Sequence, residues 1–219
     1  NRKLMQGQRL SLQEEQTFVE EMVNSPQLYE YMLDSSDDYS LYVFIPYMFG
    51  TTYFGMQICP EKSVLIPCFH DEAYLYLRLF RQAYIQARGM IYNAMPEMEL
   101  AGRVYDFSST EQICMGIGMD TDLHPDAEAF RKAYHIEKPF LLYAGRKDTG
   151  KNVHTLLRYF AEFKRRQPSD LQLVLIGGGQ IEIPVSVQDD VYDLGFVTAQ
   201  DKYNAMAAAE LLCQPSHNE

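Results

Sequence analysis

Two cations lie in a glycine-containing loop that joins a predicted strand to a predicted helix. The apolar run 139–144 predicts the strand, which ends at Gly145. The next segment has the 3.6-residue spacing of a helix, with apolar residues at positions 153, 156, 157, 160 and 163. The first N–H groups of a helix are unpaired and carry the positive end of its dipole. Because Arg146 and Lys151 add two full charges to this loop, the sequence predicts a site for a phosphorylated ligand, most readily a diphosphate.

The same loop falls short of the P-loop of nucleoside triphosphatases. A P-loop requires Ser or Thr after its Lys, where the hydroxyl binds Mg²⁺, but Lys151 is followed by Asn152. The next predicted strand, 171–176, ends in three glycines rather than in an aspartate that would hold the metal. We therefore set this class aside. The plainer alternative is that Arg146 and Lys151 are solvated loop charges, and the motifs below count against it.

Composition excludes several classes of partner. The 219 residues are 47% hydrophobic, enough for the cores of one large or two small domains. A net charge of −11 argues against nucleic acid and against anionic lipid. No apolar stretch approaches the length of a membrane span. The four cysteines lack zinc-ligand spacing, so we expect reduced thiols in a cytoplasmic protein.

The predicted elements form two series in which helix and strand alternate, the pattern of parallel sheets covered on both faces. We predict a first domain over residues 1–118, a linker with a short helix over 119–138, and a second domain over 139–219. The first domain has predicted strands at 41–46, 63–67, 89–92 and 112–115, and the second at 139–144, 171–176, 191–194 and 211–213. Ligands bind at the carboxyl ends of such strands, where His70, Arg146, Gly177 and Ser216 lie in the sequence.

The second series resembles the C-terminal domain of retaining family 4 glycosyltransferases, which have the GT-B fold. The matching segments occur in order: Gly145-Arg146, Lys151-Asn152, 173–179, 193–197, Lys202-Tyr203 and 214–219. The first series is similar to the N-terminal domain of that family at 42–47, 50–53, 67–72 and 116–120. The resemblance implies an α/β protein of GT-B type, with two Rossmann-like α/β/α domains whose parallel sheets face a central cleft.

The sequence departs from the family pattern at both ends. The family's N-terminal domain starts with a strand and a glycine-rich loop, and nothing before the helix predicted at 13–24 supplies them. The family also carries two glutamates in its donor site, of which Glu219 matches the first and no residue matches the second. We therefore expect both domains to be incomplete and this fragment itself to be inactive, even if its parent protein is an enzyme.

The resemblance also implies roles for individual residues. Transfer without a metal needs side-chain cations that stabilise the leaving phosphates, a role it gives to Arg146 and Lys151. It places Glu219 against hydroxyls of the donor sugar and His70 near the reacting sugar. The other donor-binding residues that it implies are Gly145, Gly178, Phe196, Val197, Lys202 and Ser216.

Several of these residues also have a purely structural interpretation. His70 could be a hydrogen-bonded structural residue, Phe196 and Val197 could belong to the core, and Ser216 could cap a helix after Pro215. Asp120-Thr121-Asp122 matches the Asp-x-Asp motif with which another glycosyltransferase fold holds manganese. Aspartate is common in turns for local reasons, so we expect no metal there and no cofactor.

The sequence thus predicts a retaining, hexosyltransferase-like and metal-independent glycosyltransferase of carbohydrate biosynthesis. Its expected partners are a nucleotide-diphospho-sugar and a glycan, lipid or small-molecule acceptor, with no nucleic acid. Two alternatives stay open: a GT-B-like sugar-nucleotide epimerase, and a truncated non-catalytic domain that binds nucleotide or a protein partner. Dinucleotide oxidoreduction is disfavoured, because neither the Gly116-x-Gly118 segment nor the triplet 177–179 completes GxGxxG.

Overall fold

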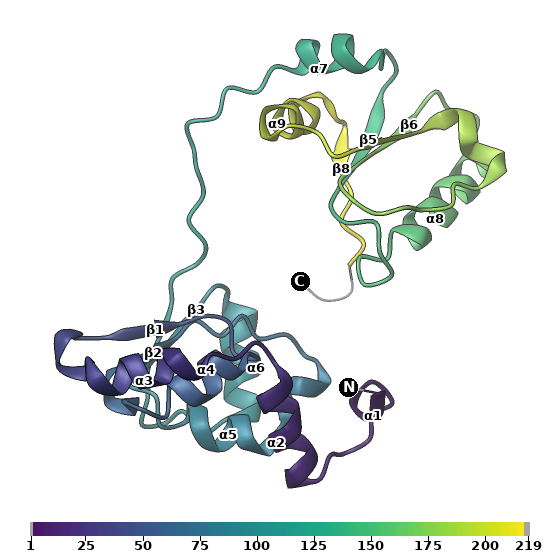
Figure 1. The fold of residues 1–219 in the computed structure, drawn as a ribbon. Helices are drawn as coiled ribbons and strands as arrows, with labels where there is room; N and C mark the ends of the chain where they lie inside the picture. Colours follow the sequence, from purple (N-terminus) through teal and green to yellow (C-terminus); the bar gives the residue numbers. More distant parts are fainter. Residues whose placement is uncertain (1, 217–219) are drawn as a thin grey trace. The chain divides into compact units, whose positions relative to one another are not determined.

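The computed structural model describes residues 2–216 and divides the chain into two compact units, Asn1–Met119 and Asp120–Glu219 (Figure 1). Each unit has its own four-stranded sheet, in which every strand pair is parallel. Parallel neighbours must be joined by crossovers, and helices supply most of them here. The α/β class predicted from the alternating pattern is confirmed.

In the first unit the strands lie in the order in which they occur along the chain: β1 (Tyr42–Phe44), β2 (Ser63–Leu65), β3 (Gly89–Tyr92) and β4 (Glu111–Cys114). The helices around them are α1 (Arg2–Met5), α2 (Leu12–Glu21), α3 (Pro26–Asp34), α4 (Gly50–Gly55), α5 (Arg78–Tyr84) and α6 (Met95–Val104). Short 3₁₀ turns complete the unit: η1 (Ser36–Asp38), η2 (Pro60–Lys62) and η3 (Ala73–Tyr76). The core is rich in aromatic rings, including Tyr47, Phe80, Tyr84 and Tyr92.

The expectation that the sheets are covered on both faces is wrong for the first sheet, beginning with the strand predicted at 41–46. Side chains alternate between the faces of a strand, and Phe44 packs against the core whereas Val43 is 58% exposed. The far edge strand β4 likewise exposes Ile113. Among the described residues, the core of this unit therefore lies against one face of the sheet. An apolar strand without alternation does not reveal which of its faces is covered.

The second unit has strands β5 (Phe140–Ala144), β6 (Gln172–Ile176), β7 (Val191–Gly195) and β8 (Leu211–Leu212), in the spatial order β7-β6-β5-β8. Its helices are α7 (Ala127–Tyr134), α8 (Val153–Arg166) and α9 (Ala199–Ala208), with the turn η4 (Val185–Asp190). Both faces of this sheet are covered. One core cluster joins Phe130 of α7 and Ala205 of α9 to Phe140, and the other joins Leu157 of α8 to Tyr143. Figure 1 shows α7 and α9 on one side of the strands and α8 on the other.

Gly177, directly after β6, is the most crowded glycine of the second unit. Its φ is +119°, and a Cβ there would lie 2.1 Å from the carbonyl oxygen of Gly145. The Gly177 N–H donates to the Gly195 carbonyl at 2.7 Å, and the Gly145 N–H donates to the Ile176 carbonyl at 2.9 Å. The loops after β5, β6 and β7 therefore meet through their backbones, at a distance that only glycine allows.

We expect Gly177→Ala to lower the free energy of unfolding of the second unit by about 2 kcal/mol or more, because backbone strain and a backbone clash act together. Urea denaturation of both proteins measures the difference. Gly150→Ala is the matched control, since its Cβ would meet only the Asp148 side chain, at 3.3 Å. A loss at Gly177 no larger than at Gly150 would contradict the prediction.

Candidate functional site

The loop after β5 displays one guanidinium group to solvent. The side chain of Arg146 is 75% exposed, and its Nε lies 3.5 Å from Oδ2 of Asp148. The loop backbone beneath it is fixed, because the Tyr143 hydroxyl donates a hydrogen bond to the Arg146 carbonyl at 2.6 Å. A Cβ on Gly145 would lie 2.8 Å from that hydroxyl. Exposed ion pairs are weak, so a stronger anionic ligand could take the guanidinium from Asp148.

Lys147, the next residue, is buried, in contrast to the exposed Arg146. Its side chain is 1% exposed, and its Nζ lies 2.5 Å from Oδ1 of Asp193 in the middle of β7. Its N–H donates to the Gly178 carbonyl at 2.7 Å. One residue thus ties the loop after β5 to the loop after β6 and to β7. The sequence reasoning missed it, because a lysine between two candidate ligand residues looks like another solvated charge.

Lys151 and Asn152 form the junction with α8. The Lys151 N–H donates to Oδ1 of Asp148 at 3.0 Å. Asn152 is the residue before the helix, is largely buried and has a φ of +56°, a region that asparagine tolerates better than most residues. Its side-chain amide donates to the Pro215 carbonyl at 3.1 Å. The asparagine that rules out a P-loop here instead connects the start of α8 to the segment after β8.

Three of the predicted donor-binding residues, Phe196, Val197 and Lys202, lie in different environments. Phe196 is 86% exposed. Its ring covers Gly178 so closely that a Cβ on Gly178 would lie 2.7 Å from the ring atoms. Val197 is half-buried and packs against the core cluster of α7 and α9. Lys202 is on α9, with its ammonium 4.5 Å from the ring centroid of Tyr203. The interpretation as a core residue therefore fits Val197 and does not fit Phe196.

Ser216 and Glu219 follow β8. The Ser216 hydroxyl oxygen is buried and has no hydrogen-bond partner among residues 2–216. Gln214, two residues earlier, donates to the Ala144 carbonyl at 2.8 Å and so holds this segment at the end of β5. Glu219 lies outside the described residues.

His70 belongs to the first unit, in the loop after β2, and is exposed. The loop is held by the buried carboxylate of Glu97, which accepts from the N–H of Phe69 at 2.8 Å and from that of Asn93 at 2.7 Å. Close by, the Tyr47 hydroxyl donates to Glu72 at 2.8 Å. Burial, and then the Glu72 carboxylate, raise the pKa of Tyr47 well above its usual range, so it stays a donor.

The structure thus gathers Gly145, Arg146, Lys151, Gly178, Phe196 and Ser216 around the carboxyl ends of the strands of the second sheet, with Val197 just beyond β7. Lys202 is one element further on, in α9, and His70 is in the other unit. In the part of the chain that the structure describes, no group of three His, Cys, Asp or Glu side chains is placed to hold a metal ion. Oδ1 of Asp122 lies 3.2 Å from Nε2 of the exposed His124, and the Asp122 N–H donates to Oδ1 of Asp120 at 3.0 Å.

Several solved structures have a fold similar to that of this chain. HepE of Anabaena, in complex with UDP and glucose, aligns with a TM-score of 0.59 and 16% identity over 87% of this chain and 56% of its own. Sucrose-phosphate synthase of Thermosynechococcus elongatus aligns with a TM-score of 0.66 and 17% identity over 96% of this chain and 57% of its own. The lipopolysaccharide outer core galactosyltransferase WaaB, in its apo form, aligns with a TM-score of 0.57 and 15% identity over 94% of this chain and 56% of its own. This chain therefore spans just over half the length of these structures.

The two α/β units, each with a parallel sheet, and the likeness to these structures define the fold as GT-B, built from two Rossmann-like domains. Within the second unit, residues 126–219 match the model of the family described as Glycosyl transferases group 1. Among curated proteins no sequence matches. In the described part, no helix is long and apolar enough to cross a membrane.

Proposed function

We propose that the protein containing this chain transfers a sugar from a nucleotide-diphospho-sugar to an acceptor. The observation that carries the proposal is the pair Arg146 and Lys151, in a loop fixed at the carboxyl ends of β5 to β7. This loop lies inside the segment matched by the glycosyltransferase family. HepE, which has a similar fold, was solved with UDP and glucose and with UDP-glucose.

In this proposal the two cations bind the diphosphate and stabilise the charge that it gains as the sugar leaves. The guanidinium of Arg146 can hold two phosphate oxygens in its fork, and the ammonium of Lys151 acts as a point charge. With the backbone N–H groups at the start of α8, they supply the positive charge that a metal would otherwise bring. We further propose retention of the anomeric configuration, a hexose as the transferred sugar, no metal or cofactor requirement, and a cytoplasmic role in carbohydrate biosynthesis.

The acceptor side would come from the first unit. His70 follows β2 on a loop that Glu97 fixes through two backbone hydrogen bonds. We propose that His70 contacts the reacting sugar. The acceptor is a glycan, a lipid or a small molecule. A donor-only turnover assay separates this function from sugar-nucleotide epimerisation, since an epimerase converts the donor without an acceptor.

Thermal unfolding with UDP, GDP and ADP tests the proposal. A nucleotide that binds only the folded state at one hundred times its Kd stabilises it by about 2.7 kcal/mol. We expect one of the three diphosphates to raise the melting temperature, and to do so equally in EDTA and in Mg²⁺. If all three leave the melting temperature of this chain unchanged, the proposal is wrong.

A shift that disappears in EDTA would contradict the metal-independent site while leaving nucleotide binding intact. Arg158→Ala is a suitable control protein for the same series. Arg158 is an exposed arginine on α8, with its guanidinium 5.5 Å from the ring centroid of Tyr159. Arg158→Ala changes the net charge by the same amount as Arg146→Ala, the variant that removes the proposed phosphate ligand. It leaves the loop after β5 intact.

A further inference from the structure

The first unit contains a cavity of about 570 Å³ that the proposed transfer chemistry does not use. Its walls come from the segment joining α1 to α2 and from η3 and α5. Leu4 and Leu77, both buried, supply an apolar floor. Three arginines line it as well: Arg9, Arg78 and Arg81. We call this cavity the arginine pocket.

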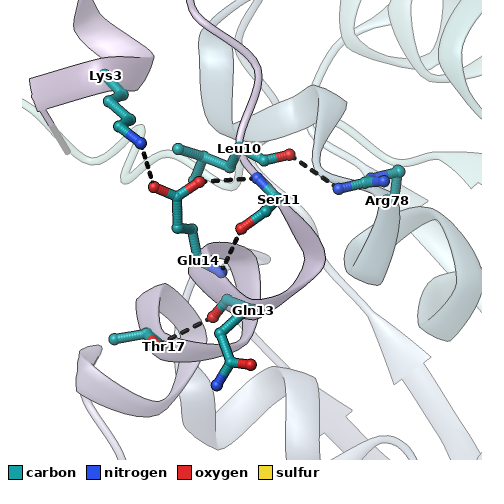
Figure 2. A network of polar contacts seen from close by, with 7 residues as sticks. All are labelled: Lys3, Leu10, Ser11, Gln13, Glu14, Thr17 and Arg78. Atoms are coloured by element: carbon teal, nitrogen blue, oxygen red, sulfur yellow. Dashed lines mark hydrogen bonds and ion pairs between the residues drawn. The ribbon is translucent and has the colours of Figure 1, made fainter.

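One of the arginines is a fixed part of the wall. Arg78 donates from Nε to Oε1 of Glu15 at 3.0 Å and from an Nη to the Leu10 carbonyl at 2.8 Å. Glu15 is 3% exposed, and its second oxygen accepts from the Leu79 N–H at 3.1 Å. Figure 2 shows the Arg78 guanidinium at the Leu10 carbonyl. Glu15 therefore neutralises Arg78 and holds α2 against the start of α5.

The segment carrying Arg9 is also held in place. Ser11 and Glu14 form a capping box at the start of α2, in which the Ser11 N–H donates to Glu14 at 2.8 Å and the Glu14 N–H donates to the Ser11 hydroxyl at 3.2 Å. Lys3 of α1 pairs with the same carboxylate (Figure 2). These contacts bracket residues 4–10, so that Arg9 is presented by a fixed loop.

The positive charges of Arg9 and Arg81 are not neutralised by a carboxylate of the described residues. Both are exposed, and neither forms an ion pair with any residue between 2 and 216. Arg81 lies three positions after Arg78 on α5, which puts the two side chains on the same side of the helix. The one carboxylate lining the cavity, Glu15, already pairs with Arg78, and nearby Asp71 accepts from the Tyr76 hydroxyl at 2.6 Å. In a chain of net charge −11, the pocket keeps two uncompensated guanidinium groups.

The position of the pocket relates it to the predicted acceptor side. The helix α5 follows β2, so its first turn lies at the edge of the sheet where the strands end and where ligands of parallel sheets bind. A single segment after β2 contains His70 and then Ala73 and Leu77 of the pocket wall. A group bound by the arginines would thus sit next to the loop that carries His70.

We propose that the arginine pocket binds the phosphate group of a small-molecule acceptor. Arginine forks match phosphate oxygens in geometry and in charge, and the apolar floor would contact the carbon skeleton beside the phosphate. The assignment to an acceptor rests on the proposed transferase function. The binding of a phosphate group does not, since it depends only on the first unit.

Nitrogen-15 NMR titration of the chain tests the pocket. Inorganic phosphate is added against sodium chloride of equal ionic strength, because exposed charges are screened by salt. We expect saturable shifts of the Gly7, Leu10 and Leu77 amides with phosphate and none with chloride. The double variant Arg9→Gln/Arg81→Gln should bind phosphate at least about tenfold more weakly, since it loses two charge-assisted donors. Arg88→Gln removes an exposed arginine of the same unit outside the pocket and should leave binding unchanged.

Further titrations identify the ligand class. Glycerol phosphate should bind and glycerol should not, while acetate binding as tightly as phosphate would overturn the choice of a phosphate over a carboxylate. Equal phosphate affinity in the double variant and in Arg88→Gln, or shifts absent from Gly7 and Leu77, would overturn the pocket itself. A nucleoside diphosphate should instead shift amides of residues 145–150. Failure there contradicts the proposed function and leaves the phosphate pocket standing, so the two failures are distinguishable.

Discussion

Arg146→Ala is expected to lower the rate of the proposed sugar transfer by about 10²–10³-fold, the loss typical of removing one preorganised donor from a developing negative charge. The side chain is 75% exposed and its partner Asp148 is 3.5 Å away, so its removal should not unfold the protein. Turnover with hexose donors of the nucleotide identified by thermal unfolding measures the effect. Lys151→Ala should act in the same direction.

Two further variants make the result specific. Arg146→Lys keeps the charge but loses the fork, so we expect an activity between those of the alanine variant and the parent. Arg158→Ala removes an exposed arginine of α8 and should leave turnover close to that of the parent. Full activity of Arg146→Ala, or an equal loss in Arg158→Ala, would contradict the role given to the loop after β5.

The second large effect concerns stability. Asp193→Ala should lower the free energy of unfolding of the second unit by about 3–5 kcal/mol, because it leaves the Lys147 ammonium buried without its partner. Lys147 is 1% exposed and the two side chains are 2.5 Å apart. Lys147→Met should cost less, since the remaining Asp193 carboxylate reaches water. Urea denaturation of the single variants and of the double variant Lys147→Met/Asp193→Leu measures all three.

The double variant distinguishes a buried pair from a general sensitivity of this position. Replacing both charges by apolar groups is often close to neutral, so we expect it to be clearly more stable than Asp193→Ala. Asp170→Ala is the control, because its partner Lys138 is half-exposed and 3.8 Å away, and such pairs contribute about 0–1 kcal/mol. If Asp193→Ala costs no more than Asp170→Ala, the ion pair does not stabilise the unit.

Most of the fold was predictable because its elements carry periodic or strongly apolar sequences. The strand at 89–92 has the predicted bounds, and the helix predicted from the apolar spacing at 153–163 is α8 (Val153–Arg166). The burial of β1 was not predictable in the same way. An unbroken apolar run is compatible with an edge strand, and the exposure of Val43 depends on which helices pack over the sheet.

Glycines and asparagine in the candidate site had sequence signatures, whereas the buried lysine had none. Gly177 allows a backbone approach that any Cβ would block, and Asn152 adopts a positive φ before α8. Lys147 is different, because lysines in loops are ordinarily solvated. Its burial is decided by Asp193, which is 46 positions away and is brought beside it only when β7 joins the sheet.

The most direct test of a diphosphate site after β5 compares three ligands that share one base. The nucleoside, its monophosphate and its diphosphate are titrated into the nitrogen-15-labelled chain in EDTA, with the base chosen from the thermal unfolding series. The account predicts that the diphosphate binds at least about tenfold more tightly than the monophosphate, since a second phosphate adds charge-assisted hydrogen bonds, and that the shifted amides lie in residues 145–150 and 177–179. Equal affinities for all three ligands, or shifts confined to other parts of the chain, would contradict it.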